Sequence, residues 1–242
     1  MSAQPNTANE ISFESLQGLV AAAHELKTPL AIISHLAAAL EDEALSSPIE
    51  RQASLRRIQL SAERTIRLVQ GLTTSYRLDG QLTLDLQPVN IGQVCEEVAH
   101  EMLPFARMQQ QTIQLELGHK AQLVVGEQEL LHSVLFNLLD NAIRHTPPQA
   151  SIRMHLRRRT EVVRVCVQDD GPGLRSSDMT RLQQRLGKQV QPIITRSSGS
   201  GLGLFIANQL ASAMGGRVGV GRVESGADFH VDLLHSAQLS LI

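Results

Sequence analysis

Residues 137–146 read Asn-Leu-Leu-Asp-Asn-Ala-Ile-Arg-His-Thr, a polar string inside an otherwise apolar helical pattern. Asn137 and Asn141 stand one helical turn apart, and Arg144 and His145 follow another turn along. Amide oxygens suit a magnesium ion and a guanidinium suits phosphate, so this face fits a magnesium–phosphate group. On its own the string fits an amphipathic surface helix equally well, because the opposite stripe is apolar: Leu131, Val134, Leu135 and Leu138.

Residues 169–173 read Asp-Asp-Gly-Pro-Gly, directly after an alternating apolar pattern at 163–167 that predicts a strand. Gly171 and Gly173 allow the backbone to turn sharply and to approach a ligand closely. Asp169 is placed to accept a hydrogen bond from the amine of a base. In isolation, a plain tight turn explains this string as well.

Residues 199–204 read Gly-Ser-Gly-Leu-Gly-Leu and open a helical pattern at 202–214. Glycines before a helix N-terminus form a phosphate cradle from free N–H groups and the helix dipole. The string lacks the Gly-Lys-Ser/Thr ending of the eight-residue phosphate loop, which excludes that class of ATPase. It also follows a loop rather than a strand, which disfavours a dinucleotide-binding fold.

The first 77 residues carry apolar side chains at alternating steps of three and four, which is typical of a coiled-coil seam. A break at Ser46-Ser47-Pro48 separates two runs, since Pro suits the first turn of a new helix. The pattern predicts a helical hairpin, which buries too little surface alone, so we expect a dimeric four-helix bundle. The first run is Leu16, Leu19, Ala23, Leu26, Leu30, Ile33, Ala37 and Leu40; the second is Leu55, Ile58, Ala62, Thr65, Val69, Leu72 and Tyr76.

Residues 24–30, His-Glu-Leu-Lys-Thr-Pro-Leu, lie within the first run. His24 falls beside the seam, so its imidazole is expected to face solvent, and Glu25 is placed to orient the ring or accept its proton. Thr28 follows one turn later on the same face, and Pro29 removes a backbone donor and is expected to bend the helix. A surface histidine is the ordinary alternative for any single His of this kind.

Beyond the turn signal Asp79-Gly80 the pattern becomes mixed α and β. Alternation predicts strands at 82–86, 113–117, 152–156, 163–167 and 229–233, and helices are expected at about 127–144 and 202–214. Pro88 and Asn90 are predicted to open another helix. Its apolar stripe is Ile91, Val94, Cys95, Val98, Met102 and Phe105. The fold class is therefore α+β: a helical hairpin followed by an α/β sandwich with helices on one face of a mixed sheet.

Composition narrows the possible functions. The 242 residues carry a net charge of −2, so no global positive field is available to hold nucleic acid or an anionic membrane. Cys95 and Cys166 are too far apart for a zinc motif, and we expect both to be buried free thiols. No apolar run is long enough to span a membrane, and the polar start does not resemble a signal peptide. We expect a soluble, cytoplasmic protein.

Taken together and in this order, the four strings resemble the catalytic core of the sensor histidine kinases of two-component signalling, over about residues 10–235. The string at 24–30 resembles that family's H-box and the string at 137–146 its N-box. The strings at 169–173 and 199–204 resemble its first and second glycine boxes. The resemblance implies an ATP-binding domain of the Bergerat (GHKL) type, ATP and Mg²⁺ as cofactors, and a homodimer.

The resemblance also implies roles for the matching residues. His24 is the phosphoacceptor, Glu25 the neighbouring base, and Thr28 the residue that positions water in a reverse phosphatase reaction. Asn137 holds Mg²⁺, Asn141 and Arg144 lie near the phosphates, and the His145 ring stacks on the nucleotide. Asp169 recognises the adenine amine. The nucleotide pocket and its lid are shaped by Gly171, Gly173, Gly199, Gly201, Leu202 and Gly203.

One departure from the family lies between the glycine boxes. Residues 174–198 contain no aromatic side chain, whereas the family usually has a Phe-containing motif there; 182–186 is the best remnant, with Arg185 the most plausible match. A lid commonly gates such a reaction, so nucleotide binding is better supported than catalytic rate.

We expect a protein-histidine kinase that phosphorylates His24 and passes the phosphoryl group to a response-regulator receiver domain. The alternatives are a phosphatase-dominant regulator and a non-catalytic, dimeric ATP-sensing scaffold. We assign residues 1–9 to a disordered tail, 10–77 to the dimerisation and phosphotransfer domain, 78–88 to a linker with the first strand, and 89–242 to the ATP-binding domain. Either this chain is a fragment of a longer kinase, or the signal reaches it through a separate sensor protein. We expect membrane association only through such a longer chain or a partner.

Overall fold

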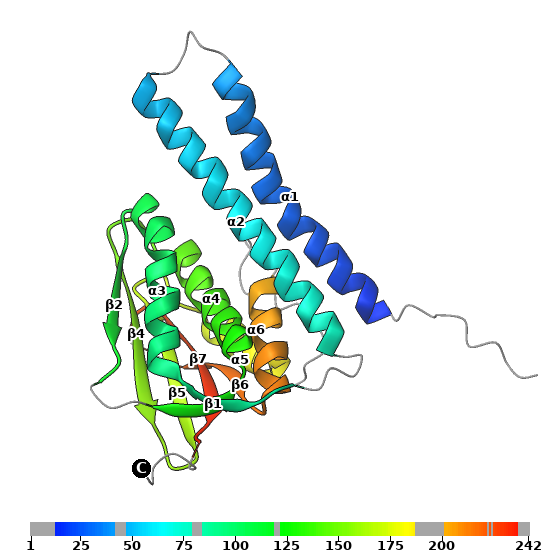
Figure 1. Ribbon diagram of the computed structural model, residues 1–242, viewed down its shortest axis with the longest axis vertical. Helices are drawn as coiled ribbons and strands as arrows, with labels where there is room; N and C mark the ends of the chain where they lie inside the picture. The colour runs from blue at the N-terminus through cyan, green and yellow to red at the C-terminus, as the bar shows by residue number, and fades with distance from the viewer. Residues whose placement is uncertain are drawn as a thin grey trace, which may run out of the picture.

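The computed structural model describes residues 13–41, 47–78, 84–118, 122–186, 201–221, 223 and 225–236. Two long helices lie against a domain in which further helices cover one face of a β-sheet (Figure 1). This order, a helical region followed by an α/β domain, confirms the predicted fold class.

The helical region consists of α1 (Phe13–Glu41) and α2 (Pro48–Leu78). A reciprocal capping box opens α2: the Ser47 N–H donates to Glu50 Oε2 (2.8 Å) and the Glu50 N–H donates to Ser47 Oγ (3.3 Å). Pro48 occupies the first helical position, where its missing N–H costs nothing. The predicted start of the second helix at this proline is therefore confirmed.

Pro29 lies inside α1, and the helix continues through it. Its carbonyl oxygen accepts a hydrogen bond from Ser61 Oγ of α2 (3.2 Å). The two helices are thus joined by a polar contact at the level of the H-box.

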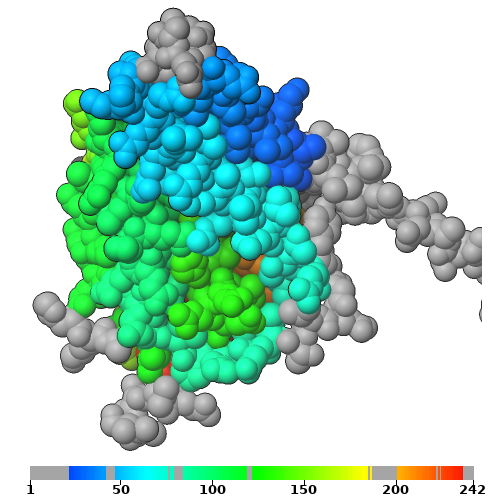
Figure 2. Space-filling view, turned by 45° about the horizontal axis from the view of Figure 1, so that its top comes forward, coloured from blue at the N-terminus to red at the C-terminus, as the bar shows by residue number. Residues whose placement is uncertain are grey.

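Much of the predicted seam is exposed in a single chain. Leu30 is 53% exposed, Leu55 58% and Val69 44%. Ala22 and Leu60, in contrast, are buried and belong to the same apolar cluster as the core of the α/β domain. Figure 2 shows α2, in cyan, lying against the green surface of this domain.

The sheet of the α/β domain has the strand order β2-β4-β5-β7-β6. Strands β2 and β4 are parallel and the other neighbours are antiparallel, so the sheet is mixed as predicted. The strands are β2 (Thr112–Glu116), β4 (Ser151–Arg158), β5 (Val162–Asp169), β6 (Arg217–Gly221) and β7 (Ala227–Leu234). A separate antiparallel pair is formed by β1 (Gln87–Asn90) and β3 (Leu123–Gly126).

Three helices cover one face of this sheet: α3 (Ile91–Met108), α4 (Gln128–His145) and α6 (Leu202–Ala213) (Figure 1). Asn90 caps α3, because its Oδ1 accepts a hydrogen bond from the Gly92 N–H (3.2 Å). Every residue of the predicted α3 stripe is buried, and so are the four apolar residues of the α4 stripe. Both Cys95 and Cys166 are buried and free, as expected.

Some local predictions were wrong. Leu84 and Leu86 are not in a strand, and Leu82 lies outside the described residues. The first described strand is β1, which begins at Gln87, directly after the predicted strand ends. Pro88 lies in β1 rather than opening α3, and it is tolerated there because β1 pairs with β3 alone in the described sheet. The sequence reading missed β3 and β6, which are short and contain glycine, and α5 (Ser176–Leu186), which is largely polar.

Among the described helices, none combines the length and the apolar character needed to cross a membrane.

Candidate active site

The H-box residues take different positions on α1. His24 and Thr28 are exposed, as predicted for two residues one turn apart on one face. Glu25, in contrast, is only 9% exposed and points toward the α/β domain. The helix therefore presents the imidazole to solvent while its neighbouring carboxylate is held in the contact between the two parts of the chain.

Asn137 lies on α4 next to the second glycine string. Its Nδ2 donates to the carbonyl oxygen of Ser133 (2.8 Å), one turn back along the helix. Its Oδ1 points toward α6, where it lies 3.1 Å from the place a Cβ would take at Gly203. A side chain at Gly203 would therefore press on the amide oxygen, and glycine keeps this oxygen accessible.

The N-terminus of α6 faces the same region. Gly201 is the N-cap and has a left-handed backbone (φ 71°), a conformation that glycine adopts without strain. Leu202 is buried and anchors the first turn. The N-cap glycine itself has no side chain with which to cap the helix, and glycine-rich helix ends of this kind commonly bind phosphate. Gly199 lies outside the described residues.

Asp169 ends β5 at the other side of the site and is 1% exposed. Its Oδ1 accepts a hydrogen bond from the Gly171 N–H (2.8 Å). A Cβ at Gly171 would lie 2.5 Å from that oxygen and 2.8 Å from the main-chain oxygen of His145. The first glycine string and the end of the N-box thus touch through main-chain atoms, which sequence spacing alone does not show.

Gly226 is a site residue that the sequence reading missed. It has φ +78°, and a Cβ there would overlap the carbonyl oxygen of Asp169. Its own carbonyl oxygen lies 2.8 Å from the place a Cβ would take at Gly173. The turn that leads into β7 therefore packs directly on the first glycine string. The available signal was the Ser-Gly pair at 225–226 before a predicted strand.

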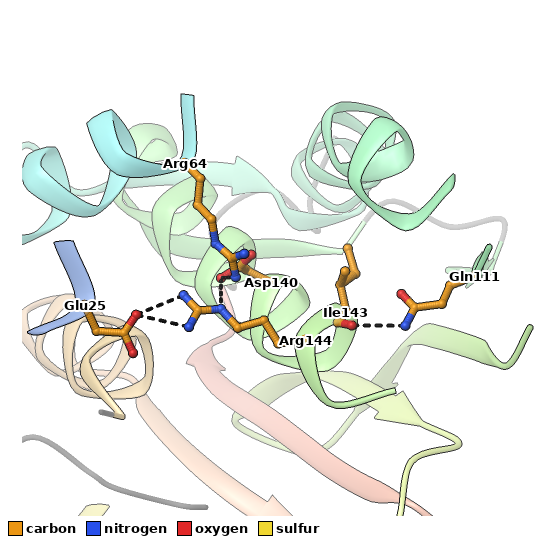
Figure 3. Close-up of polar contacts among 6 residues, drawn as sticks. All are labelled: Glu25, Arg64, Gln111, Asp140, Ile143 and Arg144. Carbon is orange, nitrogen blue, oxygen red and sulfur yellow. Dashed lines mark hydrogen bonds and ion pairs between the residues drawn. The ribbon is translucent and has the colours of Figure 1, made fainter. Parts of the chain in front are cut away.

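The C-terminal end of α4 is fixed by Gln111, which was also missed. Its Nε2 donates to the carbonyl oxygen of Ile143 (3.0 Å; Figure 3). It also donates to the carbonyl oxygen of Thr146 (2.5 Å), and the side chain is buried. These carbonyls lack helical partners at the helix end, so Gln111 satisfies them. By binding the carbonyl oxygens of Ile143 and Thr146, Gln111 also fixes the backbone at His145, which lies between these two residues.

Arg144 is exposed as a residue, but its guanidinium is paired with carboxylates. Its Nη1 and Nη2 donate to Glu25 Oε2 at 3.0 and 3.1 Å, and its Nε lies 3.3 Å from Asp140 Oδ2 (Figure 3). Asn141, one turn after Asn137, is half-buried. The structure therefore brings together an H-box and an N-box residue that the sequence reading had treated separately.

Asp140 is a further residue to which no role was assigned. It is buried, and Arg64 Nη2 of α2 donates to its Oδ2 at 2.6 Å. Burial raises the pKa of the Asp140 carboxyl, and the Arg64 guanidinium opposes that rise. A carboxylate inside the amphipathic N-box string was the signal in the sequence, but its partner comes from another helix.

The segment between the glycine strings is described in part. Leu182 and Leu186 of α5 are buried, and Gln183 Nε2 donates to the carbonyl oxygen of Val220 in β6 (3.3 Å). The remnant predicted at 182–186 is thus the last part of a helix packed on the sheet edge. The side chain of Arg185 and all of 187–200 lie outside the described residues.

Comparison with known proteins defines the class of this domain. Residues 126–237 match the family model of the histidine kinase-, DNA gyrase B- and HSP90-like ATPase, and residues 19–81 match that of the His Kinase A (phospho-acceptor) domain. The chain therefore carries an ATP-binding domain that follows a phosphoacceptor helical domain.

Individual relatives agree. The chain is 34% identical over 233 residues to "Sensor protein SphS" of Synechococcus elongatus, covering 90% of this chain and 54% of that protein. It is 30% identical over 236 residues to "Adaptive-response sensory kinase SasA" of a Synechocystis strain, covering 93% and 60%. Together, the two domains and these relatives identify the chain as a histidine kinase catalytic core. It spans only a little over half the length of these relatives.

Solved structures show the same architecture. Full-length ShkA in complex with AMPPNP superimposes with a TM-score of 0.60 at 26% identity, over 92% of this chain and 46% of that one. Histidine kinase ThkA in complex with response regulator protein TrrA gives a TM-score of 0.56 at 18% identity, over 90% and 61%, and supports the fold alone.

Proposed function

We propose that this chain is a Mg²⁺- and ATP-dependent protein-histidine kinase that phosphorylates His24 and transfers the phosphoryl group to an aspartate of a response-regulator receiver domain. The observation that carries the proposal is the convergence of the N-box on both glycine strings: Asn137 Oδ1 lies against Gly203 while Asp169 is buried beside Gly171. These contacts support a nucleotide site with both ends in one domain, and the exposed His24 lies on a helix that contacts this domain through Glu25.

At the phosphate end, Asn137 would hold Mg²⁺ through its Oδ1. The geometry fits, because Nδ2 is used along the helix and Oδ1 faces the N-terminus of α6. Mg²⁺ typically takes one or two protein oxygens and completes its shell with phosphate and water. The ion would neutralise charge on the phosphates. Asn141, Arg144 and the N–H groups at Gly201–Gly203 would complete the phosphate contacts.

At the base end, Asp169 would accept a hydrogen bond from the adenine amine. Its position is rigid, since the Gly171 N–H fixes one oxygen and the Gly226 backbone packs against its carbonyl. His145 would stack on the nucleotide, with its main chain already in contact with this end of the site.

In the transfer step, the His24 Nε2 lone pair would form a bond to the γ-phosphorus. The bond from that phosphorus to the β–γ bridging oxygen would break, and ADP would leave with its electron pair. Glu25 would take the Nδ1 proton that the imidazole sheds. An amide at position 137 is a poor base for activating water, so ATP would survive until the histidine arrives. Catalysis then consists mainly of positioning and charge neutralisation.

The receiver domain would dock on the helical region beside His24, and Thr28 would position water for the reverse, phosphatase reaction. The ThkA–TrrA complex is an example of such a pairing in a protein of the same fold. The exposed seam residues Leu30, Leu55 and Val69 support a homodimer in which a second copy completes a four-helix bundle. We place this core in the cytoplasm, where ATP is available and buried thiols stay reduced.

The direct test is incubation with γ-labelled ATP and Mg²⁺, followed by acid and alkali treatment of the labelled protein. We expect alkali-stable, acid-labile label that is lost in His24→Ala and kept in His35→Ala, a matched exposed histidine of the same helix. Nucleotide binding without label in any variant would contradict the kinase and indicate the scaffold. Label that passes to the receiver and is then rapidly lost from it in the presence of this chain, but stays on the receiver with Thr28→Ala, would indicate the phosphatase-dominant regulator.

A further inference from the structure

Four charged side chains from three helices form one connected network between the two parts of the chain (Figure 3). It runs from Glu25 on α1, through Arg144 and Asp140 on α4, to Arg64 on α2. Two carboxylates and two guanidiniums make the network neutral as a whole. Side-chain exposures are between 10% and 31%, so solvent screens these pairs less than it screens pairs on an open surface.

One oxygen of Asp140 is shared by two arginines. Arg64 Nη2 lies 2.6 Å from Oδ2, and Arg144 Nε lies 3.3 Å from the same atom. The two guanidiniums therefore compete for this oxygen, and Arg64 has the shorter contact. The strength of the Asp140–Arg144 ion pair therefore depends on how strongly Arg64 binds the same carboxylate oxygen.

The network engages the atoms that the proposed reaction would use. All three nitrogens of the Arg144 guanidinium face carboxylates, so its charge is neutralised before any phosphate arrives. Glu25 Oε2 accepts hydrogen bonds from both Nη1 and Nη2 of Arg144, and taking a proton at that oxygen would break these hydrogen bonds. Phosphate binding by Arg144 and proton uptake by Glu25 therefore both require the Arg144–Glu25 ion pair to break.

We propose that Asp140 is a positioning residue that holds Arg144 on Glu25 and away from the nucleotide phosphates, and that Arg64 limits this hold by competing for the same carboxylate oxygen. The inference rests on the proposed placement of the phosphates beside Arg144. Neither Asp140 nor Arg64 has a part in binding the nucleotide itself. Their effect on the nucleotide is carried by Arg144 alone.

Charge arithmetic gives the two residues opposite effects. Asp140→Asn keeps the size of the side chain and leaves the network with a net charge of +1, with Arg144 freed on one side. Arg64→Ala leaves the network with a net charge of −1, and the Asp140 carboxylate then interacts with Arg144 alone. A purely structural contact would instead be weakened in the same sense by either change.

The experiment measures the Kd of Mg-AMPPNP and of adenosine for the full chain by titration calorimetry. We expect Asp140→Asn to bind AMPPNP about threefold to tenfold more tightly than wild type, and Arg64→Ala to bind it weaker by a similar factor. The Arg64→Ala/Asp140→Asn double variant should return close to wild type. Adenosine, which has no phosphates, should bind all variants equally.

Arg67→Ala is the matched control. Arg67 lies on α2 one turn after Arg64, pairs with Glu101 and sits 4.8 Å over the Phe136 ring, so it contributes to the same interface without touching the network. Its AMPPNP affinity should equal that of wild type. Melting curves establish that each variant is folded.

The inference is overturned if Asp140→Asn and Arg64→Ala shift the AMPPNP Kd in the same direction, or if neither differs from Arg67→Ala. It is also overturned if adenosine affinity shifts as much as AMPPNP affinity. Failure of the proposed kinase function is separate: wild type then binds AMPPNP but takes no label on His24, and the calorimetric comparison still decides the role of Asp140.

Discussion

The helical region and the ATP-binding domain bury their apolar residues to very different degrees. In the ATP-binding domain, Leu131, Val134 and Leu135 of α4 are completely buried within a single chain. In the helical region, Leu30 and Leu55 are more than half exposed although they follow an equally regular pattern. The ATP-binding domain therefore closes a core of its own, whereas the hairpin needs other surfaces to cover its seam.

The largest expected effect tests this difference directly. Leu135→Ala should lower the free energy of unfolding of the ATP-binding domain by about 2–5 kcal/mol, because it opens a cavity in a closed core. Leu55→Ala should cost less than about 1 kcal/mol in dilute protein, where the side chain gains little from burial. Urea unfolding, followed at several protein concentrations, measures both.

The effect of protein concentration on these stability costs distinguishes the two regions further. If a second copy covers the seam, the cost of Leu55→Ala should grow as the protein is concentrated, while that of Leu135→Ala stays constant. Equal costs for the two variants at every concentration would show that the hairpin has a closed core after all.

The second prediction concerns backbone packing within the ATP-binding domain. Gly226→Ala should destabilise this domain by at least about 2 kcal/mol and abolish nucleotide binding, because the new Cβ overlaps the Asp169 carbonyl and φ is positive. Gly118→Ala is the control: φ is also positive (+74°), but nothing lies within 4 Å of the new Cβ. It should cost only about 1 kcal/mol and leave AMPPNP binding intact. Calorimetric melting and AMPPNP titration measure the two effects, and similar losses in both variants would contradict the role of close packing.

The smallest expected effect is a dependence of stability on pH that belongs to the ATP-binding domain. Burial lowers the pKa of His155 and of His230 below the ordinary value of 6.5. As the pH falls through about 6.5, the unfolded chain takes up these protons first, so stability decreases until the lowered folded-state pKa is reached. Above 6.5 both imidazoles are neutral in either state and the contribution is complete.

His155→Gln should flatten this decrease, as measured by urea unfolding between pH 7.5 and 5. His35→Gln, a change at an exposed histidine of α1, should leave the slope as it is in wild type. An unchanged slope in His155→Gln would assign the decrease to other groups.

The sequence was most informative where a residue's role depends on its neighbours along the chain. The period of the apolar residues identified α3 and α4 and their buried stripes, since a stripe of this kind is buried whatever it packs on. Polar α5 and the short, glycine-containing β3 and β6 carried no such period, and they were missed. The roles of the individual site residues and the domain limits remain predictions.

The sequence by itself determined the four strings, the helical periods and the exposure of His24, because these follow from local spacing and from the chemistry of each side chain. Only the tertiary structure placed Gly226 on Asp169, and joined Glu25 to Arg144 and Arg64 to Asp140. These contacts unite residues far apart in the chain, and their geometry is set by how helices and strands pack. Packing is a property of the whole fold, so no local pattern records which carboxylate will meet which guanidinium.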